Sequence, residues 1–170
     1  MSAVVSHSRG EIFEILESVK DPEVPVLSVV ELGVVRDVEI DAEGRAVTVV
    51  ITPTYSGCPA MKVIEDDIVA ALRDHGIPVV NVRTTYSPAW TTDWMSDEAK
   101  RKLEAYGIAP PGRASRHDEL VPLRRRSAPI RCPYCHSTNT RIESEFGSTA
   151  CKAICYCADC RQPFELFKAM

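Results

Sequence analysis

Residues 58–76, CPAMKVIEDDIVAALRDHG, carry the clearest helical pattern in the chain and set the fold around them. The apolar residues that recur at the spacing of one helical face are Met61, Ile64, Ile68 and Leu72. Pro59 is favoured in the first turn of a helix, and Gly76 is a residue type that often follows the last turn. The segment therefore predicts an amphipathic helix that packs one face against the rest of its domain.

Segments with the pattern of β-strands precede and follow this helix in the sequence. Residues 34–41 (VVRDVEID) and 46–52 (AVTVVIT) alternate in character and are joined by a turn that contains Gly44, so they predict a β-hairpin. Residues 78–87 (PVVNVRTTYS) are rich in valine and threonine and predict a third strand.

Two further helices are predicted on either side of these elements. Ser8 and Glu11 form a capping box, and the helix that follows ends at Pro22. Its apolar face consists of Ile12, Ile15, Leu16 and Val19. Residues 96–107 predict a short charged helix. The whole pattern predicts an α+β fold with the order helix, hairpin, helix and strand.

The chain changes character after these elements. Residues 108–130 are rich in proline and arginine and lack apolar periodicity, so we interpret them as a partly extended linker. Residues 131–170 contain six of the seven cysteines and predict a β module of the zinc-ribbon type. The predicted organisation is therefore an α+β domain over 1–107, a linker over 108–130 and a ribbon over 131–170.

Composition excludes several classes of protein. The net charge of −4 gives no overall attraction to nucleic acid or to anionic membranes. The chain has no apolar run of membrane-spanning length, and its N-terminus lacks the charged and apolar regions of a secretory signal. We therefore expect a cytoplasmic protein, in which clustered cysteines stay reduced and act as metal ligands or reactive groups.

Two C-x-x-C pairs, separated by 21 residues, predict a metal site in the C-terminal module. The four residues are Cys132, Cys135, Cys157 and Cys160. Two such turns can offer four thiolates to one tetrahedral ion, and so short a module needs a structural metal to be stable. We predict zinc, with iron on the same ligands as the alternative. Cys151 and Cys155 either pack as small side chains, or Cys151 is an exposed functional thiol and Cys155 replaces a ligand.

Cys58 stands apart from the other cysteines, in the stretch YSGCPAM (55–61). A position at or near the helix N-cap would place its thiol at unpaired backbone N–H groups and at the positive end of the helix dipole. Such a setting favours the thiolate, which binds metals or attacks as a nucleophile. The residues alone leave two interpretations open: a reactive or metal-binding thiol, or a buried thiol that caps the helix weakly.

Four other side chains have two interpretations each. Asp21 and Glu23 flank Pro22 and either belong to a solvated turn or contribute to a site. Trp90 and Trp94, in SPAWTTDWM, either pack in the core or form a surface for a partner, because aromatic residues concentrate at interfaces.

The stretches DPEVPVLSVVELGVVRDVEI (21–40) and TPTYSGCPAM (52–61) resemble the small domain of iron–sulfur assembly factors. SPAWTTDWMS (87–96), FGSTACKA (146–153) and the paired C-x-x-C stretches resemble one branch, the PaaD-like accessory proteins of phenylacetate degradation. The resemblance implies a non-enzymatic role in maturing the multicomponent phenylacetyl-CoA epoxidase of that pathway, by delivering iron or an iron–sulfur cluster. It assigns functional roles to Cys58, Cys151, Asp21 and Glu23. It also implies the epoxidase subunits, including an iron–sulfur reductase, as partners.

Two other functions stay open: a structural subunit of the oxygenase complex, and a nucleic-acid-binding zinc-ribbon protein. The arginine-rich linker favours nucleic acid, whereas the acidic total and the lack of paired aromatic–basic platforms oppose it. The sequence has neither a phosphate loop nor the paired Glu-x-x-His motif of di-iron proteins, so we do not expect the oxygenating subunit. The hairpin edges are compatible with a homodimer.

Overall fold

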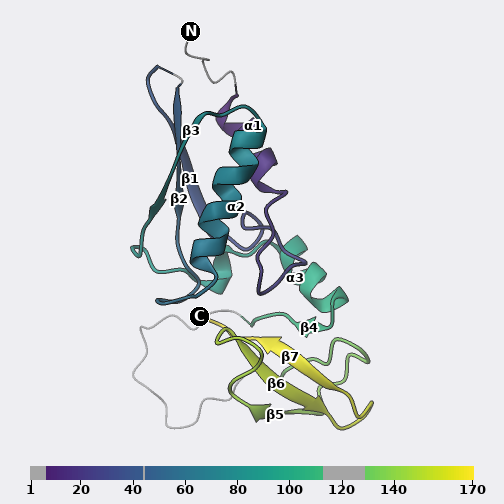
Figure 1. Cartoon of the computed structure of the whole chain (residues 1–170). Helices are drawn as coiled ribbons and strands as arrows, with labels where there is room; N and C mark the ends of the chain where they lie inside the picture. Colours follow the sequence, from purple (N-terminus) through teal and green to yellow (C-terminus); the bar gives the residue numbers. More distant parts are fainter. Residues whose placement is uncertain (1–6, 44, 113–128) are drawn as a thin grey trace. The chain divides into compact units, whose positions relative to one another are not determined.

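The structure is a computed structural model that describes residues 7–43, 45–112 and 129–170. The chain forms two compact units (Figure 1). One extends to Trp90 and includes Trp94–Ser96, and the other comprises Thr91–Asp93 and Asp97–Met170. Each unit has its own β-sheet.

The first unit is a three-stranded sheet with two helices on the same side of it (Figure 1). Its elements are α1 (Arg9–Leu16), β1 (Val35–Ile40), β2 (Ala46–Ile51), α2 (Met61–Asp74) and β3 (Val79–Thr84). β1 and β2 form an antiparallel hairpin, and β3 pairs in parallel with β2. The parallel pairing follows from α2, which returns the chain to the end of the sheet at which β2 began. This arrangement confirms the predicted order of helix, hairpin, helix and strand.

The predicted apolar faces of the helices form the core of this unit. The fully buried or nearly buried residues include Ile12 and Leu16 of α1, Ile64, Ile68 and Leu72 of α2, and Val47, Val49 and Ile51 of β2. Their burial, at about 25 cal/mol per Å² of apolar surface, holds the helices on the sheet. The predicted capping box is also present, because Ser8 Oγ accepts the Glu11 N–H and the Ser8 N–H donates to Glu11 Oε2.

The second unit contains a helix and a four-stranded sheet. Its elements are α3 (Asp97–Ala105), β4 (Ile108–Ala109), β5 (Thr140–Ser144), β6 (Lys152–Cys157) and β7 (Pro163–Phe167). The strand order is β4-β7-β6-β5, with β5, β6 and β7 antiparallel and β4 parallel to β7. The last three strands form the β module predicted for residues 131–170.

The structure divides the chain earlier than the predicted boundary at residue 107. α3 belongs to the unit that contains the ribbon, because β4 follows it directly and pairs with β7. Ile108 and Ala109, which we assigned to the linker, are only 4% and 1% exposed. Residues 113–128 of the predicted linker lie outside the described residues.

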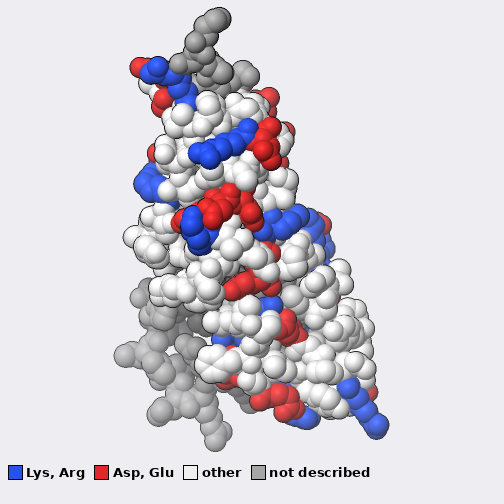
Figure 2. Space-filling model, viewed as in Figure 1, with Lys and Arg blue, Asp and Glu red and all other residues white. Residues whose placement is uncertain are grey.

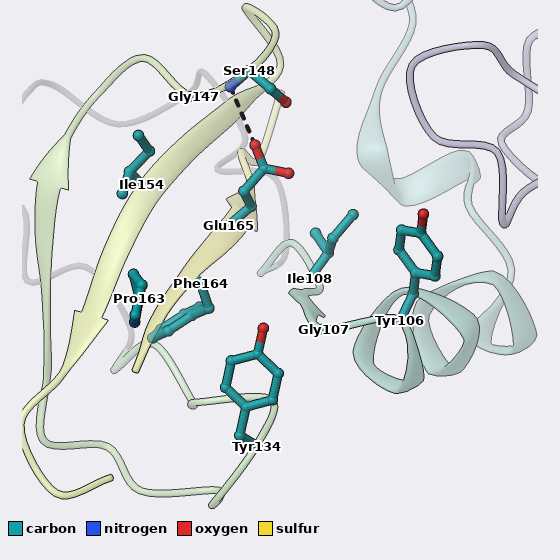
Figure 3. A pocket seen from close by; sticks show the side chains of 10 residues that line it. All are labelled: Tyr106, Gly107, Ile108, Tyr134, Gly147, Ser148, Ile154, Pro163, Phe164 and Glu165. Atoms are coloured by element: carbon teal, nitrogen blue, oxygen red, sulfur yellow. Dashed lines mark hydrogen bonds between the residues drawn. The ribbon is translucent and has the colours of Figure 1, made fainter. Parts of the chain in front are cut away.

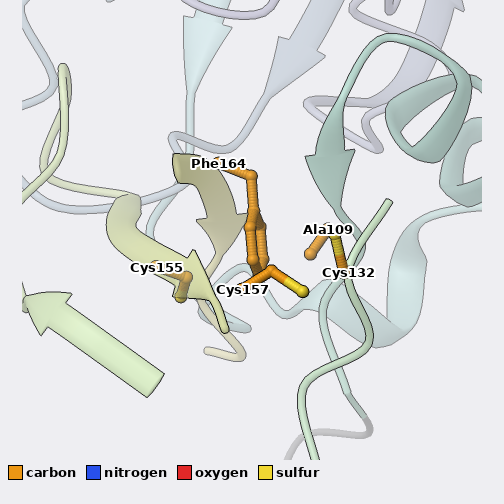
Figure 4. Close-up of a cluster of buried hydrophobic side chains, with 5 residues drawn as sticks. All are labelled: Ala109, Cys132, Cys155, Cys157 and Phe164. Carbon is orange, nitrogen blue, oxygen red and sulfur yellow. The ribbon is translucent and has the colours of Figure 1, made fainter. Parts of the chain in front are cut away.

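One cluster of buried side chains in the second unit includes three cysteines (Figure 4). It consists of Ala109, Cys132, Cys155, Cys157 and Phe164. A β module as short as the ribbon buries little apolar surface, which gives a bound metal a structural task. None of the helices in the described part of the chain is long and apolar enough to cross a membrane.

Candidate functional site

Four thiols of the second unit converge on one point. The Sγ atoms of Cys132, Cys135, Cys157 and Cys160 all lie within 4.8 Å of one another. The distance is 3.7 Å between Cys132 and Cys160 and 3.5 Å between Cys135 and Cys157. Zn–S bonds of about 2.3 Å in a tetrahedron set the sulfurs about 3.8 Å apart, so the four thiols fit such an ion. The structure thus brings the four predicted ligands together.

Both ligand pairs lie on turns of the same conformation. The residue after each pair, His136 or Arg161, has a positive φ, of 62° and 59° respectively. In each turn the N–H of the first cysteine donates to the carbonyl five residues later, at 2.9 Å for Cys132 and 3.0 Å for Cys157. The two C-x-x-C stretches are therefore equivalent knuckles, each of which directs two thiols to the same ion.

The acidity of these thiols couples metal binding to proton release. Burial raises the pKa of Cys160 to about 12, whereas backbone N–H groups, that of Cys160 first, lower the pKa of Cys157 to about 7. Ligation requires the thiolate, so an ion must displace protons from the cluster. A set of four thiolates suits zinc or iron rather than magnesium or calcium.

The other two cysteines of the second unit are buried. Cys151 is 3% exposed, and its Sγ lies 3.0 Å from Thr149 Oγ1. The expectation of an exposed thiol at Cys151 is therefore wrong, because Lys168, which follows β7, donates its N–H to the Cys151 carbonyl and holds this residue inside. Cys155 is fully buried, and burial raises its pKa to about 11, so it packs as a neutral small side chain.

Cys58 lies in the connection between β2 and α2 of the first unit. Ala60 occupies the N-cap of α2, which begins at Met61, so Cys58 precedes the N-cap by two residues. The predicted helix start at Pro59 is therefore wrong. Two successive turns occupy this stretch instead, because the Cys58 N–H donates to the Tyr55 carbonyl and the Met61 N–H donates to the Cys58 carbonyl, both at 3.3 Å.

The surroundings of Cys58 raise the pKa of its thiol. Burial is the largest cause, and the negative charges of Glu23 and Asp21 add to it, whereas the Ala60 N–H and the Tyr55 side chain act in the opposite sense. The expectation of a low-pKa thiolate is therefore wrong for the metal-free protein. The acidic loop therefore lies within electrostatic range of Cys58. A thiol among carboxylates attracts a cation, and the cation in turn favours the thiolate.

Asp21 and Glu23 differ in their contacts within the acidic loop. Asp21 is 5% exposed, and its Oδ1 accepts the N–H groups of Glu23 at 2.8 Å and Val24 at 2.9 Å. It therefore holds the turn that carries Glu23. Glu23 is only partly buried, and its charge has a larger effect on the Cys58 pKa than that of Asp21.

Thr52 is a candidate that the sequence pattern did not reveal. It directly follows β2, is 1% exposed, and its hydroxyl has no hydrogen-bond partner among the residues that the structure describes. A buried polar group without a partner costs roughly 1–3 kcal/mol, which makes such a group a candidate for binding. Thr52 begins the segment TPTYSGCP, in which the pattern does not separate a buried threonine from an exposed one.

The tryptophans pack within the first unit. Trp90 is 6% exposed, and its Nε1 donates to the Leu32 carbonyl at 3.1 Å, so the expected partner surface is wrong for this residue. Trp94 is partly buried, and the Arg36 guanidinium lies 3.5 Å from its ring centroid. Gly33 permits this packing, because a Cβ there would lie 3.0 Å from the Trp94 Cβ.

A groove of about 620 Å³ lies in the second unit (Figure 3). Its apolar lining consists of Tyr106, Ile108, Tyr134, Ile154, Pro163 and Phe164. The carboxylate of Glu165, which also lines the groove, accepts the Ser148 N–H and pairs with the Lys152 ammonium, each at 3.2 Å. The groove therefore has a lining that is largely apolar and partly aromatic, and the negative charge of Glu165 is paired with Lys152.

Acidic and basic side chains are interspersed on the face of the molecule in Figure 2. Pairs of opposite charge at short range, such as Lys62 and Asp66 at 2.5 Å, contribute to this mixture. Nucleic-acid binding depends on many phosphate contacts from a basic surface. The visible face offers no such extended basic surface among its described residues.

Comparison with known proteins agrees with the two units. Residues 9–84 match the family described as iron–sulfur cluster assembly protein, and residues 116–168 match the PaaD zinc beta ribbon domain. Fold and thiol cluster thus define a protein that joins an iron–sulfur assembly domain to a zinc-ribbon module. A protein of Escherichia coli (strain K12), provisionally named as a subunit of 1,2-phenylacetyl-CoA epoxidase, is 45% identical over 94% of this chain and 92% of its own length. The chain belongs to the family of this epoxidase subunit.

Shorter relatives match the first unit. Two of them are named Fe-S protein maturation auxiliary factor. The one from Porphyromonas gingivalis is 37% identical over 55% of this chain and 88% of its own length. The one from Bacillus subtilis is 40% identical over 56% of this chain and 92% of its own length. A crystal structure of a DUF59 domain of unknown function from Bacillus anthracis has a TM-score of 0.53 and 31% identity, over 56% of this chain and 90% of that chain. These relatives confirm the α+β fold of the first unit.

Proposed function

We propose that this protein is a non-enzymatic, cytoplasmic accessory factor that matures the multicomponent phenylacetyl-CoA epoxidase by delivering iron or an iron–sulfur cluster. The combination of modules supports this proposal. Relatives of the first unit alone are named as maturation factors, whereas the relative that matches both units is named as an epoxidase subunit. The presence of the ribbon module therefore correlates with a relative named for one particular enzyme, the phenylacetyl-CoA epoxidase.

The observation that carries the proposal is that Cys58 is partly buried within the electrostatic range of Glu23 and Asp21. A sulfur and carboxylate oxygens are donors that iron accepts, although among the described residues only the four ribbon thiols already converge on one point. The raised pKa of Cys58 leaves little thiolate in the metal-free protein, which argues against a role of this residue as a nucleophile. A partly exposed site with few ligands releases a metal more readily than the four-thiol cluster does, and delivery requires such release.

The ribbon unit supplies a permanent structural metal and a surface for the client. The groove presents Tyr106 and Tyr134, which are 58% and 55% exposed. Tyrosine is enriched in protein interfaces because its ring buries apolar area while its hydroxyl stays hydrogen-bonded. The epoxidase subunits, including an iron–sulfur reductase, are the proposed clients.

A structural role in the epoxidase complex is the second candidate, favoured by the name of the full-length relative. It requires stable association with the active enzyme and no part for Cys58. The two proposed functions therefore differ in whether they require the Cys58 thiol.

The proposal is tested by Cys58→Ser in cells that lack the wild-type gene and express the epoxidase. We expect normal levels of the variant, and an epoxidase that assembles but is poor in iron and inactive. Ser56→Ala, at an exposed position of the same loop, is the matched control and should leave activity unchanged. Full epoxidase activity with Cys58→Ser, together with stoichiometric co-purification, would establish the structural role instead.

A further inference from the structure

The four-thiol site depends on a fixed relation between two separate knuckles. Local hydrogen bonds and a positive φ shape each knuckle by itself. The knuckles are 21 residues apart in the chain, however, and nothing local to either one sets the distance between them. The pairing of β5 with β6, in which Thr140 lies opposite Cys157, brings the two knuckles together. Tetrahedral coordination places all four sulfurs within a few tenths of an ångström, so we expect a further contact across the cluster to fix their relation more closely.

Asp159 makes such a contact from the middle of the second knuckle. Its Oδ2 accepts the Ser137 hydroxyl at 2.5 Å, and its Oδ1 accepts the Asn139 side-chain amide at 2.7 Å. Both donors follow the first knuckle directly in the chain. Asn139 also accepts the Ala158 N–H on its carbonyl at 2.9 Å, and its own N–H donates to Ser137 Oγ at 3.0 Å. The carboxylate therefore joins the two knuckles through both of its oxygens.

We infer that Asp159 is a positioning residue that clamps the two knuckles and sets the lifetime of the bound ribbon metal. Asp159 is not one of the four converging ligands. A zinc ion with four thiolates has a net charge of roughly −2, so a nearby carboxylate opposes the site electrostatically. Asp159 therefore favours metal binding through the geometry of its hydrogen bonds, although its negative charge disfavours the negatively charged site. This inference concerns the ribbon metal alone and does not depend on what Cys58 binds.

The test compares zinc release from full-length variants in excess chromogenic chelator. Removing a hydrogen-bonded group outside the ligand shell typically weakens metal binding by 10–100-fold, so we expect Asp159→Ala to release zinc about tenfold faster than wild type. The cobalt-loaded variant should keep the absorption of tetrahedral thiolate coordination, because all four ligands remain. Glu143→Ala removes an equal charge from an exposed position on β5 and should release zinc at the wild-type rate.

Two further variants separate a clamp from a general effect on folding. The double variant Ser137→Ala/Asn139→Ala removes the same bonds from the other side, so adding Asp159→Ala to it should accelerate release no further. Asp159→Asn keeps the side-chain volume and one oxygen, and should accelerate release less than Asp159→Ala does. Additive effects of the two sides, or slower release from Asp159→Asn because its charge is gone, would overturn the inference.

Discussion

Glu23 acts on Cys58 from a loop 35 residues earlier in the chain, and its carboxylate raises the pKa of that thiol. In the metal-free protein burial, with this charge added to it, favours the protonated thiol. In the proposed metal-bound state the carboxylate becomes an attractive partner for the cation, and the thiol loses its proton. We therefore expect metal binding at this site to depend on pH.

Cys58 should react slowly with iodoacetamide at neutral pH, at a rate that still rises above pH 9, because only the thiolate reacts. Glu23→Gln removes a charge that raises the pKa, so it should increase the rate at pH 8. Peptide mass spectrometry of the pulse-labelled protein measures this one site. Glu14→Gln, on the exposed side of α1, is the charge control, and an equal increase from it would refute the pairing.

Asp21→Ala should destabilise the first unit by roughly 1–3 kcal/mol, because it leaves the N–H groups of Glu23 and Val24 without their acceptor. Glu23→Ala should cost less than about 0.5 kcal/mol, since this side chain is only partly buried. Urea unfolding followed by circular dichroism compares the two. Equal losses would mean that Asp21 does not hold the turn.

Cys155→Ala should retain the metal ion of the four-thiol cluster, whereas Cys157→Ala should lose it. Cys157 belongs to the converging thiols, and Cys155 is fully buried in the core beside them. Elemental analysis of the purified variants gives the stoichiometry. Loss of metal from Cys155→Ala, with retention in Cys157→Ala, would show that Cys155 is the ligand instead.

Chelation of the ribbon metal should unfold the sheet of the second unit and leave the first unit folded. A buried cluster of the ribbon includes Cys132 and Cys157, whose thiols would no longer be held by the ion, and so short a module is weakly stable without it. Hydrogen exchange should show lost protection over 130–167 and retained protection in β2 and α2. Simultaneous loss in both would show that the first unit depends on the metal as well.

Gly33→Ala should destabilise the first unit by roughly 1–3 kcal/mol, since Gly33 has a φ of 77° and its added Cβ would crowd Trp94. Thermal unfolding measures the loss. Gly112→Ala is the control, because a Cβ there meets no atom within 4 Å, and it should leave the melting temperature unchanged.

The features that the sequence predicted correctly are those encoded by spacing along the chain. The apolar stripe Ile64, Ile68 and Leu72 follows helical periodicity, and the two C-x-x-C pairs follow the geometry of one ion. Each pattern is a short, fixed spacing between residue types, so it can be recognised in the sequence before the fold is known.

Features that depend on distant residues were not predictable in this way. The burial of Trp90 depends on Leu32, and the burial of Cys151 depends on the chain after β7. The Cys58 pKa is raised above all by burial and further by carboxylates from another segment, and the N–H of Ala60 at the helix start does not offset this rise. β4 has only two residues, too few for any periodicity, yet it joins α3 to the ribbon unit.

The central claim, that Cys58 binds iron for delivery, is tested most directly by purification without air. Iron, sulfide and zinc content and visible absorbance are measured for wild type beside Cys58→Ser. We predict that wild type binds iron in addition to the single ion of the four-thiol cluster, and that Cys58→Ser retains only that ion. Equal iron in both proteins, or zinc alone in both, would contradict the account.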